Sequence, residues 1–520
     1  MNFLALQITM PDVNLWLILP EMIVCIVAVL VMLVDAFAKP TQRWVTGGLS
    51  LLGLAAAATS ACWLWQSWTG PREAFNGMIV LDDLRLGFTF VFLIVSALTI
   101  LVSTVWVENE RLPAGEFHCL LMFATSGMMF MASAGDLVMV FLGLEILSIA
   151  TYVMCGFRRA DLRSNESSMK YFVLGSFSSA FLLYGIALVY GATSTAAGLP
   201  GTTNINEIGA RIADAQYPVL LFAGAAMMLV GFGFKIATAP FHIWTPDVYE
   251  GAPTPVTAFM AAGPKAAGFA SFMRVFVFGF PFVVAAGSAN VAGKLHAAWV
   301  LALVVLAIAT MTVGNVVAIA QNNVKRMLAY SSIAHAGYAL VGFIAAGAAT
   351  DIDQRNVAIS AVVFYLLTYA VMNLGAFAVV QLIARDGDRR TEVEDYNGIG
   401  FQSPWLAFCL SLFLLSLLGM PLTAGFIGKV MVFRAALDQG YYVLVVIGVL
   451  NTAVSAYYYL RLIIVMFFRE RTTVWHAPRV PAGIGVALVL TILGVLYLGL
   501  FPGRVINALQ TKPVVPVTMR

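Results

Sequence analysis

The sequence alternates along nearly its whole length between long apolar runs and short polar connections. A run of about 20 predominantly apolar residues is long enough to cross a bilayer as a helix. Runs of this kind predict about fourteen spans, at residues 15–37, 43–67, 88–107, 117–134, 137–157, 169–191, 217–241, 255–281, 297–320, 326–348, 357–384, 403–436, 441–468 and 482–502. We therefore expect an all-α polytopic membrane protein, and the length of the twelfth run indicates a helix that is tilted or broken.

Two of these spans carry a helix breaker close to a charged residue. In the seventh span Pro240 follows Lys235, and in the twelfth span the Gly-Met-Pro sequence at 419–421 precedes Lys429. Interrupted helices at matching positions of two halves are a sequence sign of a transporter's site near the membrane midplane. Helices 7 and 12 are therefore expected to be broken, with chance placement of the prolines as the alternative.

This placement predicts two inverted repeats of five helices each, because an odd number of spans reverses the orientation of a unit. Helices 1–3 are expected in residues 1–116, and helix 14 with a tail in residues 482–520. The first repeat, helices 4–8, would occupy residues 117–281, and the second, helices 9–13, residues 297–468. Each repeat would supply one part of an ion path, and we name these parts the first and second half-channels.

The distribution of Lys and Arg predicts which side of the membrane each connection faces. Basic residues are more frequent in the odd-numbered connections, for example Arg158, Arg159 and Arg163, than in the even-numbered ones. Positively charged connections tend to stay in the cytoplasm, and acidic residues count little in this rule. Both termini are thus expected on the opposite, periplasmic side.

Composition excludes a soluble enzyme. Hydrophobic residues make up 61% of the 520 positions and charged residues 11%, whereas charged residues are roughly 25% of an ordinary globular chain. The five cysteines are scattered through apolar runs without a CxxC pair, which predicts neither a disulfide framework nor an iron–sulfur site. Sequence motifs for nucleotide binding and for zinc peptidases are absent. We expect a chain that moves ions and not electrons, with no cofactor or metal of its own and no nucleic-acid partner.

Four charged residues inside apolar runs are the strongest functional signal in the sequence. They are Glu145, Lys235, Lys265 and Lys429. A charge at the bilayer centre costs roughly 2.5–3.5 kcal/mol on insertion scales, so such residues usually face a bundle interior and mark an ion or proton path. We expect all four to be buried.

These residue types suit proton transfer. A lysine in a low-dielectric site tends to lose its proton, whereas a nearby carboxylate stabilises the ammonium form. Movement of Glu145 relative to Lys235 would then switch the lysine between holding and releasing a proton, with a static ion pair as the alternative. Lys265 has no acid in its own span and would pass protons laterally. Lys429 has no acidic neighbour in spans 10 to 12 and would be the last relay before an exit.

Three further ionisable residues are weaker candidates. His335 lies well inside the tenth span, where an imidazole can donate and accept protons or can be a hydrogen-bonded structural residue. Arg274 and Glu21 lie nearer the ends of their spans, and exposure at the membrane interface is the interpretation that we favour for both.

Five stretches resemble the antiporter-like subunits of proton-pumping NADH:quinone oxidoreductase, respiratory complex I. They reach from about 137 to 437 and read FLGLEILSIATYVMCGF, SSMKYFVLGSFSSAFLLYG, GFGFKIATAPFHIWTPDVYEGAPTPVTAFMA, NNVKRMLAYSSIAHAGY and LLGMPLTAGFIGKVMVF. The pattern TAPFHxWxPDxYEGAP is close to diagnostic of the superfamily. Lys429, where M-type subunits typically carry a glutamate, and the lack of the C-terminal lateral helix of L-type subunits make the chain look like the N-type subunits.

The resemblance implies a role for each matching position. Glu145 would be the acid partner of Lys235, the pumping lysine of the first half-channel. Lys265 would connect the two half-channels at mid-membrane, and Lys429 would lead protons from the second half-channel to the periplasm. His335 matches a position on the central polar axis.

The resemblance also implies a setting. The chain would be a non-redox subunit of a proton-translocating NADH:quinone reductase in the bacterial inner membrane. NADH, FMN, iron–sulfur clusters and quinone would belong to partner subunits, and the neighbours would be the M-type subunit, the small K and J subunits, and the lateral helix of the L-type subunit. The alternatives are a cation/proton antiporter subunit, a membrane subunit of an energy-converting hydrogenase, and a scaffold whose buried charges only fix helix packing.

Overall fold

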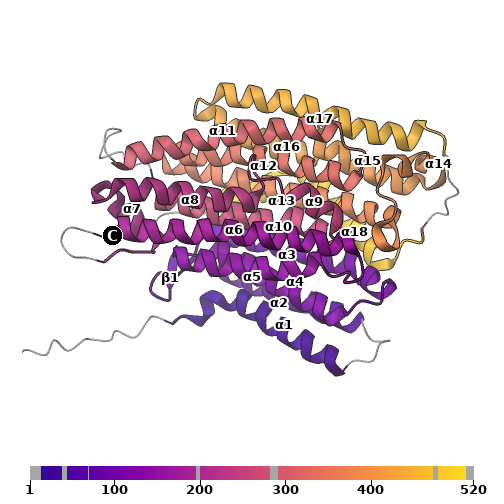
Figure 1. Ribbon diagram of the computed structural model, residues 1–520, viewed down its shortest axis with the longest axis horizontal. Helices are drawn as coiled ribbons and strands as arrows, with labels where there is room; N and C mark the ends of the chain where they lie inside the picture. The colour runs from indigo at the N-terminus through magenta and orange to yellow at the C-terminus, as the bar shows by residue number, and fades with distance from the viewer. Residues whose placement is uncertain are drawn as a thin grey trace, which may run out of the picture.

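The computed structural model describes residues 13–37, 44–67, 70–194, 200–281, 291–471 and 478–510, so the tail expected at 511–520 lies outside the described residues. The described chain is almost entirely helical, and its long helices lie side by side in one bundle (Figure 1). In the view of Figure 1 the first two helices lie at the lower edge of the bundle, and the helix of Tyr442–Phe468 lies at the upper edge.

The long helices follow the predicted spans in order. Those of the first half are α1 (Leu19–Phe37), α2 (Trp44–Gln66), α3 (Asp83–Asn109), α4 (Ala114–Ser133), α5 (Leu137–Cys155), α6 (Leu162–Ala192), α8 (Pro218–Ile236) and α10 (Thr254–Met273). Those of the second half are α11 (Val291–Ile319), α12 (Val324–Ala348), α13 (Ile352–Ala384), α15 (Pro404–Leu418), α16 (Ala424–Asp438), α17 (Tyr442–Phe468) and α18 (Ala482–Leu500).

Shorter elements cover the two ends of the bundle. The antiparallel strands β1 (Arg72–Ala74) and β2 (Ile79–Leu81) and helix α7 (Ile205–Arg211) lie at one end, and helix α14 (Ile399–Gln402) lies at the other (Figure 1). Helices α9 (Thr245–Gly251) and α19 (Gly503–Gln510) follow α8 and α18.

Eleven of the described helices are long and apolar enough to cross a membrane. The fourth, eighth and twelfth predicted spans fall on α4, on α10, and on the pair of α15 and α16, which are not among the eleven. The polytopic all-α prediction is therefore confirmed, while the number of spans stays a prediction.

Two short connections between helices lie close to the breakers in the seventh and twelfth predicted spans. Helix α8 ends at Ile236 and α9 begins at Thr245, while α15 ends at Leu418 and α16 begins at Ala424. Each first segment is closed by a residue with left-handed backbone, Ala237 with φ 60° and Gly419 with φ 93°. A left-handed residue after the last turn is a common way to end a helix, and glycine adopts that conformation without a Cβ penalty.

The centre of the bundle is formed by α10, α12 and α13. Every residue of α10 is buried. In the apolar 18-residue stretches of α12 and α13, 94% and 89% of the residues are buried, whereas 33% are buried in that of α6. An all-round buried helix needs apolar and small residues on every face, which α10 supplies with its alanines and glycines. The ionisable side chains of Lys265 on α10 and His335 on α12 are therefore held away from lipid.

Two predictions about span ends are wrong. Glu21 is completely buried and pairs with Arg85 at 2.8 Å, and Arg274 is buried and donates to both carboxylate oxygens of Asp82 at 2.7 Å. Interface exposure was the expectation for both residues because they lie near the ends of their predicted spans. Buried charges persist when they are paired and hydrogen-bonded, and here the partners come from α3 and from the residue that caps it.

Candidate functional site

Lys235 lies in the last turn of α8, where its side chain is 5% exposed. Its Nζ donates to Ser148 Oγ on α5 at 2.9 Å and stands 5.8 Å from the centre of the Tyr171 ring. A Cβ placed on Gly268 of α10 would come within 3.4 Å of Lys235 Cγ, so the backbone of α10 runs directly beside the lysine stem. The lysine thus stands between α5, which carries the predicted acid, and α10, which carries Lys265.

Glu145 and Lys235 are close without forming an ion pair. Among the described residues no salt bridge joins them within 4.0 Å, although the charge of Glu145 acts on Lys235. Glu145 precedes Ser148 by one turn of α5 and is half-buried, where full burial was expected; its buried Oε1 has no hydrogen-bond partner in the described chain. Ser148 therefore takes the place beside the lysine that the resemblance would give to the carboxylate.

A small cavity adjoins Ser148 and Lys235. It has a volume of about 10 Å³ and is lined by polar groups that include Ser148, Ser178 and Lys235. About 10–15 Å³ is the space needed by one water molecule, which also needs two or more polar partners. The site has room for one water at the lysine.

Lys265 lies on the fully buried helix α10, directly after Pro264. Its Nζ donates to Ser332 of α12, to the carbonyl oxygen at 2.6 Å and to the hydroxyl at 2.5 Å. Within the described chain it makes no ion pair within 4.0 Å. The serine accounts for two of the three donors of the amine, so Lys265 is tied to α12 and not to an acid.

His335 follows Ser332 by one turn of α12 and is 2% exposed. Its Nδ1 is 2.7 Å from the Tyr365 hydroxyl on α13, and its Nε2 is 3.4 Å from the Tyr459 hydroxyl on α17. The charges of Lys265 and Lys429 both act on the ring. His335 thus lies within electrostatic reach of both lysines, with a hydroxyl group near each ring nitrogen.

Lys429 lies in α16, 4% exposed, and reaches back across the break to the end of α15. Its Nζ donates to the carbonyl oxygens of Leu418 at 2.9 Å and Leu417 at 3.2 Å and lies 4.6 Å from the centre of the Tyr338 ring. The last carbonyl groups of a helix have no partner within it and carry the negative end of its dipole. The carbonyl groups at the end of α15 therefore stabilise the ammonium group of Lys429, for which the described chain provides no carboxylate partner.

The sequence analysis missed most of the groups that contact these side chains. Ser332, His335 and Tyr338 recur every third residue, a spacing that places them on one face of α12, and this regularity was the available signal. The Tyr338 hydroxyl accepts a hydrogen bond from the side-chain amide of Asn315 on α11 at 3.1 Å. The same amide nitrogen lies 3.4 Å from the side-chain oxygen of Asn451 on α17. The described chain contains no cluster of side chains that could hold a metal ion.

The arrangement can move protons between groups that both donate and accept. Lysine, histidine, serine and tyrosine side chains lie in the interior of the bundle on adjoining helices, where Lys235 contacts Ser148, Lys265 contacts Ser332 and His335 contacts Tyr365. Hydroxyl groups are at once donors and acceptors, so they can link amines that do not touch. The geometry supports a lateral path across the middle of the bundle.

A separate ionic cluster joins the connections at one end of the bundle. Asp388 accepts hydrogen bonds from Arg158 at 2.8 Å, from Lys325 at 3.2 Å and from the Thr254 hydroxyl at 2.8 Å. Burial alone would raise the pKa of Asp388, but the charges of Lys325 and Arg158 hold it at about 2, below its ordinary 3.8. These residues come from connections that the charge pattern assigned to one side, so the cluster fixes the two halves of the bundle to each other.

Comparison with known proteins gives matching results. A family model described as NADH:quinone oxidoreductase/Mrp antiporter, transmembrane, matches residues 134–455. The protein named NADH-quinone oxidoreductase subunit N from Trichlorobacter lovleyi is 44% identical over 500 residues, which are 96% of each chain.

Solved structures show the same fold. A chain of respiratory complex I from Thermus thermophilus with bound aureothin is 34% identical with a TM-score of 0.76, over 95% of this chain and 100% of that chain. A chain of the archaeal membrane-bound sulfane sulfur reductase is 25% identical with a TM-score of 0.81, over 95% and 96% of the two chains.

Proposed function

The chain belongs to the NADH:quinone oxidoreductase/Mrp antiporter transmembrane family, and we propose that it acts as a subunit N, the proton-translocating and non-redox part of a membrane arm. The observation that carries this proposal is that three buried lysines and a buried histidine in the bundle interior contact serine, tyrosine or helix-end carbonyl groups, and we take these residues as the members of the lateral path. Intramembrane ionisable residues are costly and usually serve transport. NADH, FMN, iron–sulfur clusters and quinone belong, on this proposal, to partner subunits.

In the first half-channel, Lys235 is loaded and discharged by a change in its surroundings. With Ser148 as its hydrogen-bond partner the lysine stands near Glu145 but apart from it. Approach of the carboxylate would favour the ammonium form, and retreat would favour release toward Lys265. Redox chemistry in other subunits would provide the electrostatic change that drives this movement.

From Lys265 the proton passes to the second half-channel through α12. Ser332 contacts Lys265, and His335 lies one turn further along the same face, within electrostatic reach of Lys265 and Lys429. Lys429 then holds the proton against the carbonyl end of α15 before it leaves to the periplasm.

The architecture that we propose has fourteen spans. The segments α8 with α9 and α15 with α16 are taken as broken helices 7 and 12, within two inverted repeats at 117–281 and 297–468. Both termini lie on the periplasmic side of the bacterial inner membrane, since the more basic connections meet at the opposite end. The neighbouring antiporter-like subunit M, the small subunits K and J and the lateral helix of subunit L are the partners.

The experiment that tests the function is removal of the Lys235 amine in the intact complex. Lys235→Met keeps an unbranched side chain of similar length and removes the ionisable group. We expect proton uptake into reconstituted vesicles to fall by about 100-fold, the range of a positioned proton-transfer group, while the complex still assembles. Lys294→Met, at an exposed lysine of α11, is the matched control. Undiminished pumping by an intact Lys235→Met complex contradicts the relay.

The second candidate function is cation/proton exchange without redox chemistry, because the matched family model also describes Mrp antiporters. Purification decides between the two. Subunits that oxidise NADH and carry iron–sulfur clusters will accompany the chain if it is part of a quinone reductase, and their absence from an intact preparation favours the antiporter.

A further inference from the structure

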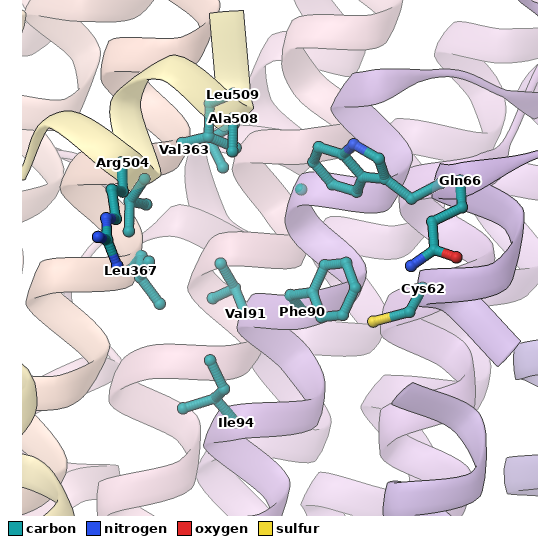
Figure 2. A pocket seen from close by; sticks show the side chains of 13 residues that line it. Cys62, Gln66, Phe90, Val91, Ile94, Val363, Leu367, Arg504, Ala508 and Leu509 are labelled. Atoms are coloured by element: carbon teal, nitrogen blue, oxygen red, sulfur yellow. The ribbon is translucent and has the colours of Figure 1, made fainter. Parts of the chain in front are cut away.

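A groove between the N-terminal and C-terminal helices is unrelated to the lateral path. It lies where α19 crosses over α13 beside α2 and α3, and has a volume of about 440 Å³ (Figure 2). We call it the α19 groove. Pockets of about 300–1,000 Å³ lined by apolar side chains with a few polar groups are typical small-molecule sites.

The helices that frame the groove are held at fixed positions. The Ser360 hydroxyl of α13 donates to the carbonyl oxygen of Leu509 at 2.9 Å, which ties α19 to α13. A Cβ on Gly87 of α3 would lie 3.2 Å from both Leu509 and Val363, so α3 approaches both helices closely at this point. The groove is therefore a built feature of the packing and not a gap left by a loose terminal helix.

The lining combines a long apolar wall with one cation. Phe90, Val91 and Ile94 of α3 face Val363 and Leu367 of α13, while Arg504 of α19 leans over one end of the groove and Cys62 lies at the other (Figure 2). Arg504 is exposed and has no ion-pair or hydrogen-bond partner in the described chain. A free guanidinium beside an apolar wall matches a ligand with an acyl chain and an anionic head.

We propose that the α19 groove binds an anionic phospholipid, with an acyl chain along α3 and α13 and its phosphate against Arg504. Guanidinium groups pair with phosphate through two parallel hydrogen bonds, and basic pockets between membrane helices select anionic head groups. The proposal is independent of proton transfer, because none of the groove residues belongs to the lateral path.

A neighbouring groove provides the contrast. On the other side of α19 a cavity of about 460 Å³ contains Arg434, but Asp353 and Asp438 also line it. An anionic head group there would meet two carboxylates, whereas at Arg504 it meets the cation alone. The two grooves have similar volumes, and the charges that line them favour binding of an anionic head group in the α19 groove.

Photo-crosslinking tests the proposal in the purified intact complex. Nanodiscs would contain phosphatidylglycerol or phosphatidylcholine with a diazirine on the acyl chain, and labelled peptides would be mapped by mass spectrometry. Both lipids carry a phosphate, but in phosphatidylcholine its charge is compensated by the head group's own trimethylammonium, whereas phosphatidylglycerol is a net anion. Because a hydrogen bond to a charged group contributes about tenfold or more in affinity, we expect phosphatidylglycerol to label segments 62–66, 87–94 and 363–367 about tenfold more than phosphatidylcholine. In the Arg504→Gln complex, labelling by phosphatidylglycerol should fall to the level of phosphatidylcholine. In the Ala508→Trp complex, where the new side chain fills the groove, labelling by both lipids should fall.

Arg434→Gln is the matched control, an exposed arginine at the same end of the bundle beside α19, and it leaves labelling unchanged. Equal labelling by the two lipids, or full labelling of the Arg504→Gln complex, overturns the proposal. So does capture of a neighbouring subunit by a bifunctional thiol reagent at Cys62, because the occupant is then a protein and not a lipid.

Discussion

The two half-channels hold a buried lysine next to a helix break in different ways. In the first, Lys235 precedes the break and donates to Ser148 on another helix, while the carbonyl group of Phe234 accepts hydrogen bonds from the Trp244 indole and the Ala237 N–H, each at 3.1 Å. In the second, Lys429 follows the break and itself bonds the carbonyl groups of Leu417 and Leu418. One lysine is held by side chains and the other by backbone.

This difference separates two kinds of control. A carboxylate such as Glu145 can change its charge and its position, whereas helix-end carbonyl groups keep a fixed partial charge. The first half-channel can therefore be set from outside by moving an acid, while the second offers a constant environment. The missing mirror image of Glu145 in the second half is a functional asymmetry on this view.

We expect the largest effect at the ionic cluster around Asp388, because this cluster holds the two halves of the bundle in a fixed position relative to each other. Asp388→Asn leaves Lys325 buried without its carboxylate, which costs about 3–5 kcal/mol when one partner of a buried pair is removed, whereas Arg158 keeps its ion pair with Glu110 at 2.6 Å. We expect a marked loss of thermal stability of the purified complex. Glu116→Gln, in the exposed pair with Arg159, is the control and changes stability by less than about 1 kcal/mol.

The pH dependence of the same cluster follows from the sign of its shift. A carboxyl group whose pKa is lowered on folding contributes stability above its unfolded value and loses that contribution as pH falls toward the folded value. For Asp388 the loss lies between about 3.8 and 2. Variation of pumping with pH near neutrality must therefore arise elsewhere, and a stability profile that already falls at pH 6 because of Asp388 contradicts this account.

The next largest effect tests whether the second half-channel is needed at all. Lys429→Met removes the only group that the α15 carbonyl end holds, and we expect proton translocation to fall by about 100-fold, as with Lys235→Met. Vesicle pumping by an assembled complex is the measurement, with Lys294→Met again as control. If the complex pumps normally, one half-channel suffices and the comparison fails.

A smaller effect is expected for the acid of the first half-channel. Glu145→Gln removes a charge that acts on Lys235 from beyond direct contact. At an effective dielectric constant near 20, charges 4 Å apart interact by about 4 kcal/mol, and a more distant charge that contributes about 2 kcal/mol is equivalent to roughly 30-fold in rate. Pumping should fall by that factor, with partial recovery in Glu145→Asp. Glu207→Gln, at an exposed carboxylate, should pump normally. If Glu145→Gln lowers the pumping rate as much as Lys235→Met does, Glu145 must act on Lys235 by direct contact and not across a gap.

The smallest effect concerns the step between the halves. Tyr365→Phe keeps the ring and removes the hydroxyl that contacts His335 Nδ1, leaving a buried polar atom without a partner at a cost of about 1–3 kcal/mol. A decrease of about threefold in pumping rate is expected, with an intact complex. Tyr330→Phe, at a half-buried tyrosine whose ring lies 6.4 Å from that of His242, is the control. No change with Tyr365→Phe would mean that His335 works without this hydroxyl.

The apolar pattern was sufficient for the fold class and for the positions of the three buried lysines. A charge within a long apolar run has few alternatives to burial, so Lys235, Lys265 and Lys429 could be found from local sequence. Glu145 shows the limit of that argument, because a run of sequence does not reveal which face of α5 points outward, and its side chain is half-buried.

The partners of the charged groups could not be predicted, because they come from distant segments and common residue types. Arg274 meets Asp82 across 192 positions of sequence, and Arg85 meets Glu21 across 64. Serines, tyrosines and backbone carbonyl groups occur throughout membrane helices, so nothing in the sequence distinguishes Ser332 or the carbonyl of Leu418 from the rest.

The half-buried position of Glu145 has a practical consequence for how the chain can be studied. Its neighbours Leu142, Ile146 and Ile149 point outward from α5 and are 47%, 38% and 59% exposed. Whatever packs on that surface, whether detergent, lipid or another subunit, sets the dielectric constant around the carboxylate. Measurements on the isolated chain and on the assembled complex would therefore be made under different boundary conditions at the first half-channel, and under nearly the same ones at the second.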